Sequence, residues 1–221
     1  MTSPDFRALY APFADAERAV LNAAYMKNRF PFLGIPTGPR RAASKVLVKA
    51  SRAWDEATLR CAVEELWAMP EREFQYLGTE LLVAATPRLG PDHLPWVKTL
   101  VERKSWWDTI DTLAPWVVGT VVLNHPECGA GMDTWGEEPD FWVVRVAMLH
   151  QLRFKTRTDE ARLFQLCLRH AESAEFFLRK GAGWALREHA KTNPESVYAF
   201  LDEHRSRFSG LTIREAEKYR K

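Results

Sequence analysis

The segment EFFLRKGAGWALREHAKTNP, at 175–194, contains the side chains best suited to chemistry. On a helix, steps of four, three and four residues place Lys180, Trp184, Arg187 and Lys191 on one stripe. Cations that flank an aromatic ring are suited to bind a phosphate backbone and the face of a base or sugar. The alternative interpretation is a solvated basic face with a half-buried tryptophan.

A carboxylate and an aromatic ring come together in a second segment, KSWWDTID at 104–111. If this segment is helical, Trp106 faces the core, while Trp107 and Asp111 share another face. Two adjacent tryptophans cannot both point into one core, so one of them is expected at a surface or cleft. Trp107 and Asp111 are therefore the candidate site of this segment. The alternative is a tryptophan packed on neighbouring helices beside a solvated aspartate.

A buried arginine is expected in the third segment, DFWVVRVAMLHQLRFK at 140–155. Its first three turns are apolar almost all round, apart from Arg145, and a helix of that kind is buried. Because an unpaired buried charge is very costly, Arg145 needs an anion, either a carboxylate or a ligand phosphate. Arg153 and Lys155, further along, could add phosphate contacts.

The elements that must position these residues are helices, because apolar positions recur at helical spacing and alternating strand patterns are nearly absent. Ser105 is expected to cap the central helix, with Asp108 at its third position as in a capping box, and Pro115 to kink it. A polar loop with glycines is expected at 125–139. The helices of this all-α fold are expected at 13–28, 41–50, 55–68, 70–86, 91–102, 106–120, 140–154, 159–171, 174–192, 195–205 and 212–220.

The spacing of the helix pairs is about 35–45 residues, which is the range of HEAT-like repeats. No repeated sequence motif accompanies this spacing, so a compact bundle and a solenoid of stacked helical hairpins both stay open. A solenoid would offer a concave surface to an extended partner.

Composition excludes several classes of protein. The chain has 221 residues, of which 46% are apolar and 27% charged, as in soluble globular proteins. No stretch approaches the roughly 18 consecutive apolar residues of a membrane helix, and the N-terminus lacks the apolar core of a signal peptide. Three cysteines without C-x-x-C spacing indicate free thiols in a reducing compartment, so a cytoplasmic protein is expected.

The net charge of +2 hides an uneven distribution of charged residues. Residues 141–221 hold 16 Lys and Arg against 10 Asp and Glu, so of the totals of 31 and 29 the rest of the chain holds 15 and 19. A basic half can bind a polyanion, although many ordinary domains show the same asymmetry.

Other catalytic patterns are missing from the sequence. The six histidines lack metal-ligand spacing and no cysteine pair accompanies them, so no metal is expected. The acids Asp133, Glu137, Glu138 and Asp140 are expected to be solvated. The sequence has no Walker A loop, G-x-G-x-x-G or G-x-S-x-G motif, so nucleotide hydrolysis and serine-hydrolase chemistry have no support.

Taken together, these segments resemble the AlkD-type DNA glycosylases, the DNA alkylation repair family built from HEAT-like repeats. The resemblance spans most of the chain in the same order, and its most specific motifs are WWD-x-x-D at 106–111 and GWALRE-x-AKTNP at 183–194. The other matching segments are YMKNRFPFLGIPT (25–37), ELW-x-x-PEREFQ (65–75) and FWVVRVAMLHQLRFK (141–155).

The resemblance implies a right-handed αα superhelix, a single HEAT-like-repeat domain over 1–221, whose concave face holds duplex DNA. It implies hydrolytic release of N3- and N7-alkylated purines, chiefly 3-methyladenine and 7-methylguanine, without flipping the damaged base into a pocket. By position, Asp111 would be the catalytic carboxylate, with Trp107 and Trp184 as aromatic walls around the lesion. Arg145 would bind a phosphate beside them. The other expected DNA-binding residues are Thr37, Arg153, Lys155, Lys180, Arg187 and Lys191.

The chemistry of the lesion agrees with a single carboxylate. An N-alkylated purine is cationic and leaves as a neutral base, so it needs no general acid, whereas ordinary glycosidases use two carboxyl groups. Asp111 would stabilise the positive charge that develops on the sugar. Uncharged lesions are expected to be poor substrates, and no lysine stands out beside Asp111 to form the Schiff base of a lyase. A monomer without cofactor is expected. The alternatives to a glycosylase are a non-catalytic DNA-structure-binding relative and a helical-repeat scaffold for protein interactions.

Overall fold

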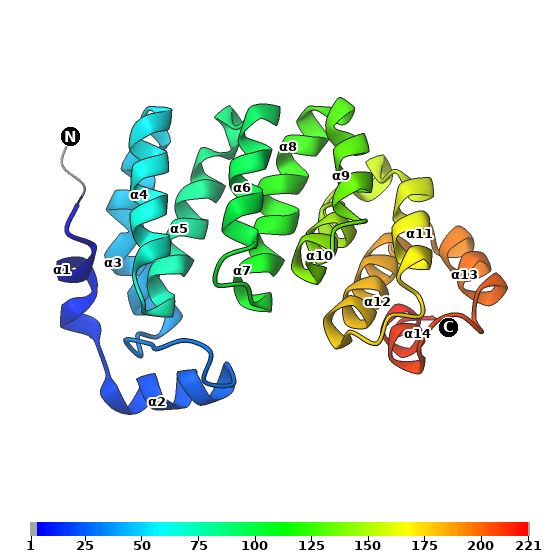
Figure 1. Cartoon of the computed structure of the whole chain (residues 1–221), viewed down its shortest axis with the longest axis horizontal. Coiled ribbons are helices and arrows are strands. Elements are labelled where there is room, and N and C mark those ends of the chain that lie inside the picture. The colour runs from blue at the N-terminus through cyan, green and yellow to red at the C-terminus, as the bar shows by residue number, and fades with distance from the viewer. Residues whose placement is uncertain (1–3, 221) are drawn as a thin grey trace. The chain divides into compact units, whose positions relative to one another are not determined.

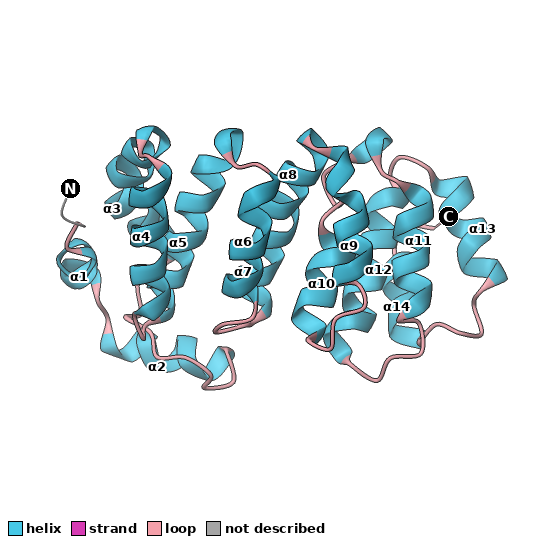
Figure 2. Cartoon of the chain, turned by 45° about the horizontal axis from the view of Figure 1, so that its top comes forward, coloured by secondary structure: helices cyan, strands magenta, loops and turns pink. Residues whose placement is uncertain are grey.

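The computed structural model describes residues 4–220, and all the regular structure among them is helical (Figures 1 and 2). This confirms the all-α prediction. Residues 4–88 and 89–220 form two compact units. Within the described part of the chain, no helix is both long and apolar enough to cross a bilayer.

The first unit is built from helices that begin at acidic caps and pack through apolar faces. Asp15 and Asp55 cap α2 and α4, where each carboxylate accepts a hydrogen bond from a backbone N–H of the first turn. α4 and α5 pack against each other, and α3 packs on α5 (Figure 1). The helices of this unit are α1 (Phe6–Tyr10), α2 (Ala16–Tyr25), α3 (Thr37–Ala50), α4 (Glu56–Ala68) and α5 (Arg72–Ala85).

A buried carboxylate fixes the loop before α3. Glu73 accepts hydrogen bonds from the backbone N–H groups of Leu33 (2.9 Å), Gly34 (2.9 Å) and Ile35 (3.2 Å). Gly34 has a φ of 82°, a conformation that other residues rarely adopt, and a Cβ there would lie 2.1 Å from a backbone oxygen. The loop therefore has one conformation, and it sets Thr37 at the exposed first position of α3.

The second unit carries the three segments that the sequence singled out. α12 packs against α10 and α14, and α7 packs against α10. Helices joined by short loops make up this unit in Figure 2. They are α6 (Leu94–Val101), α7 (Trp107–Thr112), a π-helix (Leu113–Val118), α8 (Gly119–Asn124), α9 (Gly129–Trp135), α10 (Phe141–Leu149), α11 (Glu160–Arg169), α12 (Phe176–Ala190), α13 (Pro194–Glu203) and α14 (Gly210–Ala216).

The helix expected at 106–120 differs from its prediction at both its start and its centre. The capping box is wrong: α7 begins at Trp107 with Trp106 as its N-cap residue, and the Ser105 hydroxyl donates to the carbonyl of Val101. The centre is a π-helix around Pro115, which has no N–H to donate to the helical ladder. The proline therefore changes the helix type, and α8 continues beyond it.

The loop expected at 125–139 is also wrong, because it contains a short helical turn and α9. Two glycines and several polar residues hide the helical pattern there. Met132 and Trp135 are its buried side chains, 0% and 8% exposed, and they lie three residues apart on one face. Burial of those two side chains stabilises a helix whose local propensity is weak.

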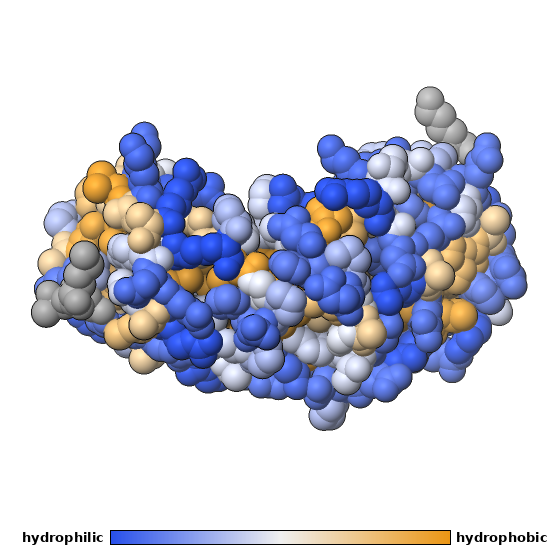
Figure 3. Space-filling model, turned by 90° about the horizontal axis from the view of Figure 1, so that it is seen from above, coloured by the Kyte–Doolittle hydropathy of each residue, from blue (hydrophilic) through white to orange (hydrophobic). Residues whose placement is uncertain are grey.

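The surface is mainly polar. On the face shown in Figure 3, hydrophilic side chains predominate and hydrophobic atoms form separate patches. The three cysteines are free thiols, of which Cys167 is buried, so no disulfide contributes to the stability of the fold.

Candidate functional site

A cleft of about 460 Å³ in the second unit brings together side chains from α7, α10, α12 and α14. It contains the predicted catalytic residues Trp107, Asp111 and Trp184 in one place. Its complete lining is Trp107, Asp111, Arg145, Phe176, Phe177, Lys180, Trp184, Arg187, Glu215 and Lys218.

The adjacent tryptophans point in different directions, as expected. Trp106 is 8% exposed and packs on Trp142 and Phe177, with ring centroids 5.7 Å and 5.0 Å away. Trp107 is half-buried and lines the cleft. Packing of Trp106 on two other rings fixes the start of α7, so the position of Trp107 is set by its neighbour.

Asp111 and Arg145 form a two-pronged ion pair at the wall of the cleft. Arg145 Nε donates to Oδ1 of Asp111 at 2.8 Å, and Nη2 donates to Oδ2 at 2.9 Å. The third donor, Nη1, is hydrogen-bonded to the carbonyl of Phe177. The anion that buried Arg145 needs is therefore a carboxylate in this structure; its role as a phosphate ligand stays a prediction.

Burial dominates the electrostatics of Asp111. Its side chain is 21% exposed and that of Arg145 only 3%. Desolvation raises the pKa of the Asp111 carboxyl above its usual value, although the hydrogen bonds and the charge of Arg145 act to lower it; the charge of Asp108 raises it further. The ionised carboxylate is thus held in position but poorly solvated, which makes it more reactive toward a nearby positive charge.

Glycine on α12 makes room for the arginine. A Cβ at Gly181 would lie 2.9 Å from Nη1 of Arg145 and 3.3 Å from the sulfur of Met148. The contact of α12 with α10 therefore depends on the missing side chain. No pattern in the sequence indicated the role of Phe177, whose carbonyl and ring both contact the arginine.

A second ionic cluster, which we call the Glu215 cluster, consists of Lys180, Arg187 and Glu215. Lys180 Nζ is hydrogen-bonded to Oε1 of Glu215. Arg187 Nη1 donates to Oε2 at 2.6 Å and to the backbone carbonyl of Glu215 at 2.9 Å. The hydrogen bond from Lys180 is the main reason why the pKa of the Glu215 carboxyl is lowered. Lys180 and Arg187, two of the predicted DNA-binding cations of the cleft, thus share one acid, which no sequence pattern indicated.

Close packing of α14 on α12 places that acid. A Cβ at Gly183 would lie 2.5 Å from Cβ of Glu215 and 2.7 Å from the carbonyl oxygen of Thr212. The Thr212 hydroxyl also donates to the carbonyl of Arg179 on α12, at 3.2 Å. The close approach of the two helices therefore depends on the missing side chain at Gly183.

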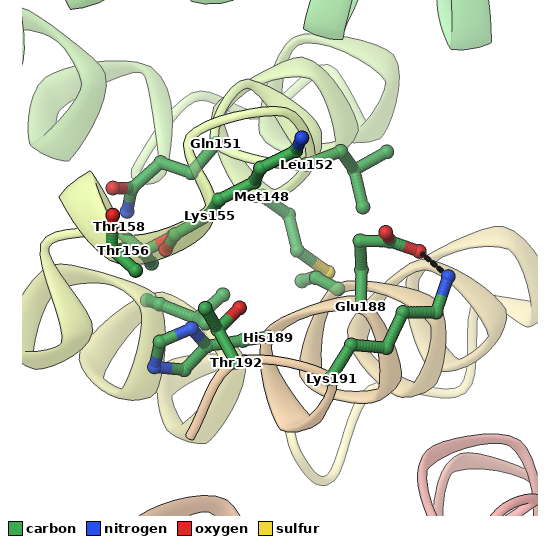
Figure 4. A pocket seen from close by; sticks show the side chains of 12 residues that line it. Met148, Gln151, Leu152, Lys155, Thr156, Thr158, Glu188, His189, Lys191 and Thr192 are labelled. Atoms are coloured by element: carbon green, nitrogen blue, oxygen red, sulfur yellow. Dashed lines mark hydrogen bonds and ion pairs between the residues drawn. The ribbon is translucent and has the colours of Figure 1, made fainter. Parts of the chain in front are cut away.

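The remaining predicted DNA-binding residues lie outside the cleft. Lys155 and Lys191 line a separate pocket of about 320 Å³, where Lys191 is paired with Glu188 at 2.6 Å (Figure 4). Arg153 lies over the exposed ring of Trp116, 3.4 Å from its centroid. The stripe on α12 is therefore divided between two pockets.

No metal site is found among residues 4–220, because no three His, Cys, Asp or Glu side chains come close enough together to hold an ion. Three of the acids grouped in the sequence near 133–140 are in ion pairs, and the fourth, Asp140, caps α10. Asp133 pairs with Arg162 at 2.8 Å, and Glu138 with Lys98 at 2.7 Å.

The helical architecture and the cleft define a helical-repeat protein similar to known DNA alkylation repair structures. A solved structure from Enterococcus faecalis, described as a predicted DNA alkylation repair enzyme, is 33% identical with a TM-score of 0.88, over 94% of this chain and 96% of that chain. AlkD2 from Streptococcus mutans is 14% identical with a TM-score of 0.62, over 79% of this chain and 89% of that chain, and is similar in fold. A comparison with curated proteins gave no match.

The sequence model of the DNA alkylation repair enzyme family matches residues 7–219. The chain belongs to the DNA alkylation repair enzyme family. The resemblance to AlkD-type proteins is thereby confirmed, and so is the helical-repeat fold class.

Proposed function

We propose that this protein is a monofunctional DNA glycosylase that releases cationic N3- and N7-alkylated purines from duplex DNA. One observation carries the proposal: a part-buried, oriented carboxylate, Asp111, lies in the same cleft as two tryptophans, Trp107 and Trp184. We further propose that the chain acts as one domain and as a cytoplasmic monomer. The match of the family over 7–219 supports a single functional domain.

The reaction needs charge stabilisation more than proton transfer. The alkylated purine is already cationic, so breaking the N-glycosidic bond releases a neutral base and moves positive charge to the sugar. The carboxylate of Asp111 would stabilise this oxocarbenium-like sugar and orient the attacking water. A second carboxyl group is not needed to protonate the leaving group.

The size of this effect can be estimated from Coulomb's law. Two unit charges 4 Å apart attract by roughly 4 kcal/mol at an effective dielectric constant near 20. That energy corresponds to about three decades in rate. Arg145 reduces the field of Asp111 but fixes both carboxylate oxygens, so it acts as a positioning residue.

The aromatic rings and cations would bind the damaged nucleotide. Trp107 and Trp184 can each attract a cationic base or sugar by cation–π interaction, worth about 0.5–2 kcal/mol. Lys180, Arg187 and Lys218, which line the same cleft, add positive charge for backbone phosphates.

The test is release of 7-methylguanine from a methylated duplex by the wild type, by Asp111→Asn and by the control Asp108→Asn. Each variant removes one negative charge from α7, but only Asp111 lines the cleft. We expect a rate about a thousandfold lower for Asp111→Asn and a rate close to wild type for Asp108→Asn. Wild-type rates in Asp111→Asn would refute the catalytic assignment.

The main competitor is a DNA-binding relative without base release, since both oxygens of Asp111 are already bonded to Arg145. Steep salt dependence of duplex binding without release of any base by the wild type would favour it. Intact abasic DNA is the expected product of the glycosylase, and a covalent adduct trapped by borohydride would contradict it.

A further inference from the structure

We propose that Glu215 occupies, in the free protein, the place that a DNA phosphate takes on Lys180 and Arg187. DNA would displace the carboxylate on binding, so Glu215 weakens binding to undamaged duplex. This inference rests on the proposed function for its ligand, a DNA backbone, but not on base release.

The geometry of the Glu215 cluster matches that of a bound phosphate. Each carboxylate oxygen accepts from one cation: Oε1 from Lys180 Nζ and Oε2 from Arg187 Nη1 at 2.6 Å. Two oxygens of a phosphate group can take the same two positions. The carboxylate therefore satisfies the donors that a strand of DNA would otherwise engage.

An incoming phosphate can reach these cations. The side chain of Lys180 is 42% exposed, that of Arg187 is 18% exposed, and both line the cleft with Glu215. Trp184 lies between the two cations on α12, four residues after the first and three before the second. A phosphate bound there would belong to the nucleotide that stacks near this ring.

Glu215 lies on α14, and the packing of α14 on α12 keeps its carboxylate close to Lys180 and Arg187. Glycine at 183 lets α14 approach α12 so closely that a Cβ at that position would lie 2.5 Å from Cβ of Glu215. The backbone carbonyl of Glu215 also accepts from Arg187 at 2.9 Å. The backbone thus stays anchored to Arg187 when the side chain moves aside.

Exchange of one anion for another changes how binding responds to salt. Each phosphate that a protein cation neutralises releases counterions condensed on the DNA, which steepens the salt dependence by about 0.9 per contact. The negative charge of Glu215 beside the two cations offsets one of their positive charges, so fewer DNA counterions are released. The carboxylate therefore reduces both the affinity for any duplex and the steepness of its salt dependence.

The experiment measures binding of an undamaged duplex as a function of salt for Glu215→Gln, Glu215→Asp and Glu203→Gln. The glutamine removes the charge at nearly the same shape. The aspartate keeps the charge but withdraws it by one methylene group from both cations. Glu203, whose side chain is 74% exposed on α13, is the matched control for loss of one negative charge.

We expect Glu215→Gln to bind about three to ten times more tightly at low salt, with a slope steeper by about one unit. Glu215→Asp should bind more tightly by a smaller factor, and Glu203→Gln should differ from wild type by less than about twofold. In a protein that already carries both Lys180→Gln and Arg187→Gln, adding Glu215→Gln should not increase the affinity for duplex DNA. Circular dichroism of each variant checks that the fold is retained.

Three outcomes would overturn the inference. Weaker binding by Glu215→Gln would mean that the acid positions the cations for DNA. An equal gain in affinity for Glu203→Gln would mean that net charge alone affects binding. Unchanged binding by Glu215→Gln would mean that DNA does not displace the carboxylate from the two cations. If the affinities change as expected but wild type releases no alkylated base, the glycosylase proposal fails and this inference stands. If the affinities are unchanged and wild type does release the base, this inference fails and the glycosylase proposal stands.

Discussion

Asp111 and Glu215 line the same cleft, but their environments shift their pKa values in opposite directions. Burial raises the pKa of the Asp111 carboxyl, whereas the hydrogen bond from Lys180 lowers that of Glu215. Asp111 is held by Arg145, a partner with 3% of its side chain exposed, while Glu215 is held by Lys180, which is 42% exposed, and by Arg187, which is 18% exposed. Two carboxylates in one site can therefore have two roles.

The two ion pairs differ in whether another anion can replace the carboxylate. A buried ion pair is costly to break, because either charge would be left in a medium of low polarity. An ion pair at an open wall contributes little to stability and is screened by solvent, so another anion can replace it. The first arrangement suits a group that must stay in position through a reaction, and the second suits a contact that is exchanged when DNA binds.

The pH dependence of base release is the largest expected effect. Only the ionised form of Asp111 can stabilise a cation, so the rate should fall on acidification, by about tenfold per pH unit below its pKa. Because burial raises that pKa, the midpoint should lie above the ordinary value of about 3.9 for an aspartate. Single-turnover release of 7-methylguanine between mildly acidic and neutral pH measures the midpoint.

Duplex binding over the same pH range is the internal control. Glu215 has a lowered pKa and stays ionised where Asp111 becomes protonated, so its competition with DNA should not change. A rate that is flat with pH, or a binding constant that follows the rate, would contradict separate roles for the two acids.

Removal of Arg145 should lower the free energy of unfolding much more than removal of Lys180. Arg145→Met leaves a buried carboxylate without its partner and should lower the free energy of unfolding by about 3–5 kcal/mol. Lys180→Met breaks a pair at an exposed side chain and should change it by about 0–1 kcal/mol. Chemical denaturation of both variants gives the comparison directly.

A double variant identifies the cause of the larger loss. If the penalty comes from the unpaired carboxylate, Asp111→Leu combined with Arg145→Met should recover much of the stability, since an apolar pair has no charge to desolvate. Equal losses in the single and double variants would show that Arg145 stabilises the fold through its contact with the carbonyl of Phe177.

The sequence predicted that buried Arg145 needs an anion, without identifying which one, but it gave no sign of the Glu215 cluster, and the reason is physical. Arg145 stands in an apolar helix, and the cost of burying a charge requires an anion whatever the fold. The different surroundings of Trp106 and Trp107 follow from their adjacency, because two adjacent tryptophans cannot both point into one core. These inferences use only local periodicity and the energetics of burial.

The identity of a distant partner depends on tertiary packing. Glu215 lies 35 residues from Lys180 along the chain, and only the approach of α14 to α12 brings them together. The π-helix around Pro115 and the burial of α9 likewise depend on packing rather than on local propensity. Sequence periodicity gives the helices and their faces, but not which helix supplies the acid to a stripe of cations.

The last prediction tests whether the close packing of α14 on α12 holds the carboxylate of Glu215 in place. Gly183→Ala would place a methyl group 2.5 Å from Cβ of Glu215 and 2.7 Å from the carbonyl oxygen of Thr212, so α14 must shift away. Overpacking of this kind costs about 1–3 kcal/mol, which should lower Tm by roughly 2–4 °C per kcal/mol. Gly131→Ala on α9 is the control, because a Cβ there meets nothing within 4 Å.

The same shift should change DNA binding in the opposite sense to stability. Movement of α14 withdraws Glu215 from Lys180, so Gly183→Ala should bind undamaged duplex more tightly while unfolding at a lower temperature. Because a destabilised protein ordinarily loses ligand affinity, a gain is diagnostic of a competing internal anion. Loss of both stability and affinity would instead show that α14 supports DNA binding, and the two carboxylates would then act in the same direction.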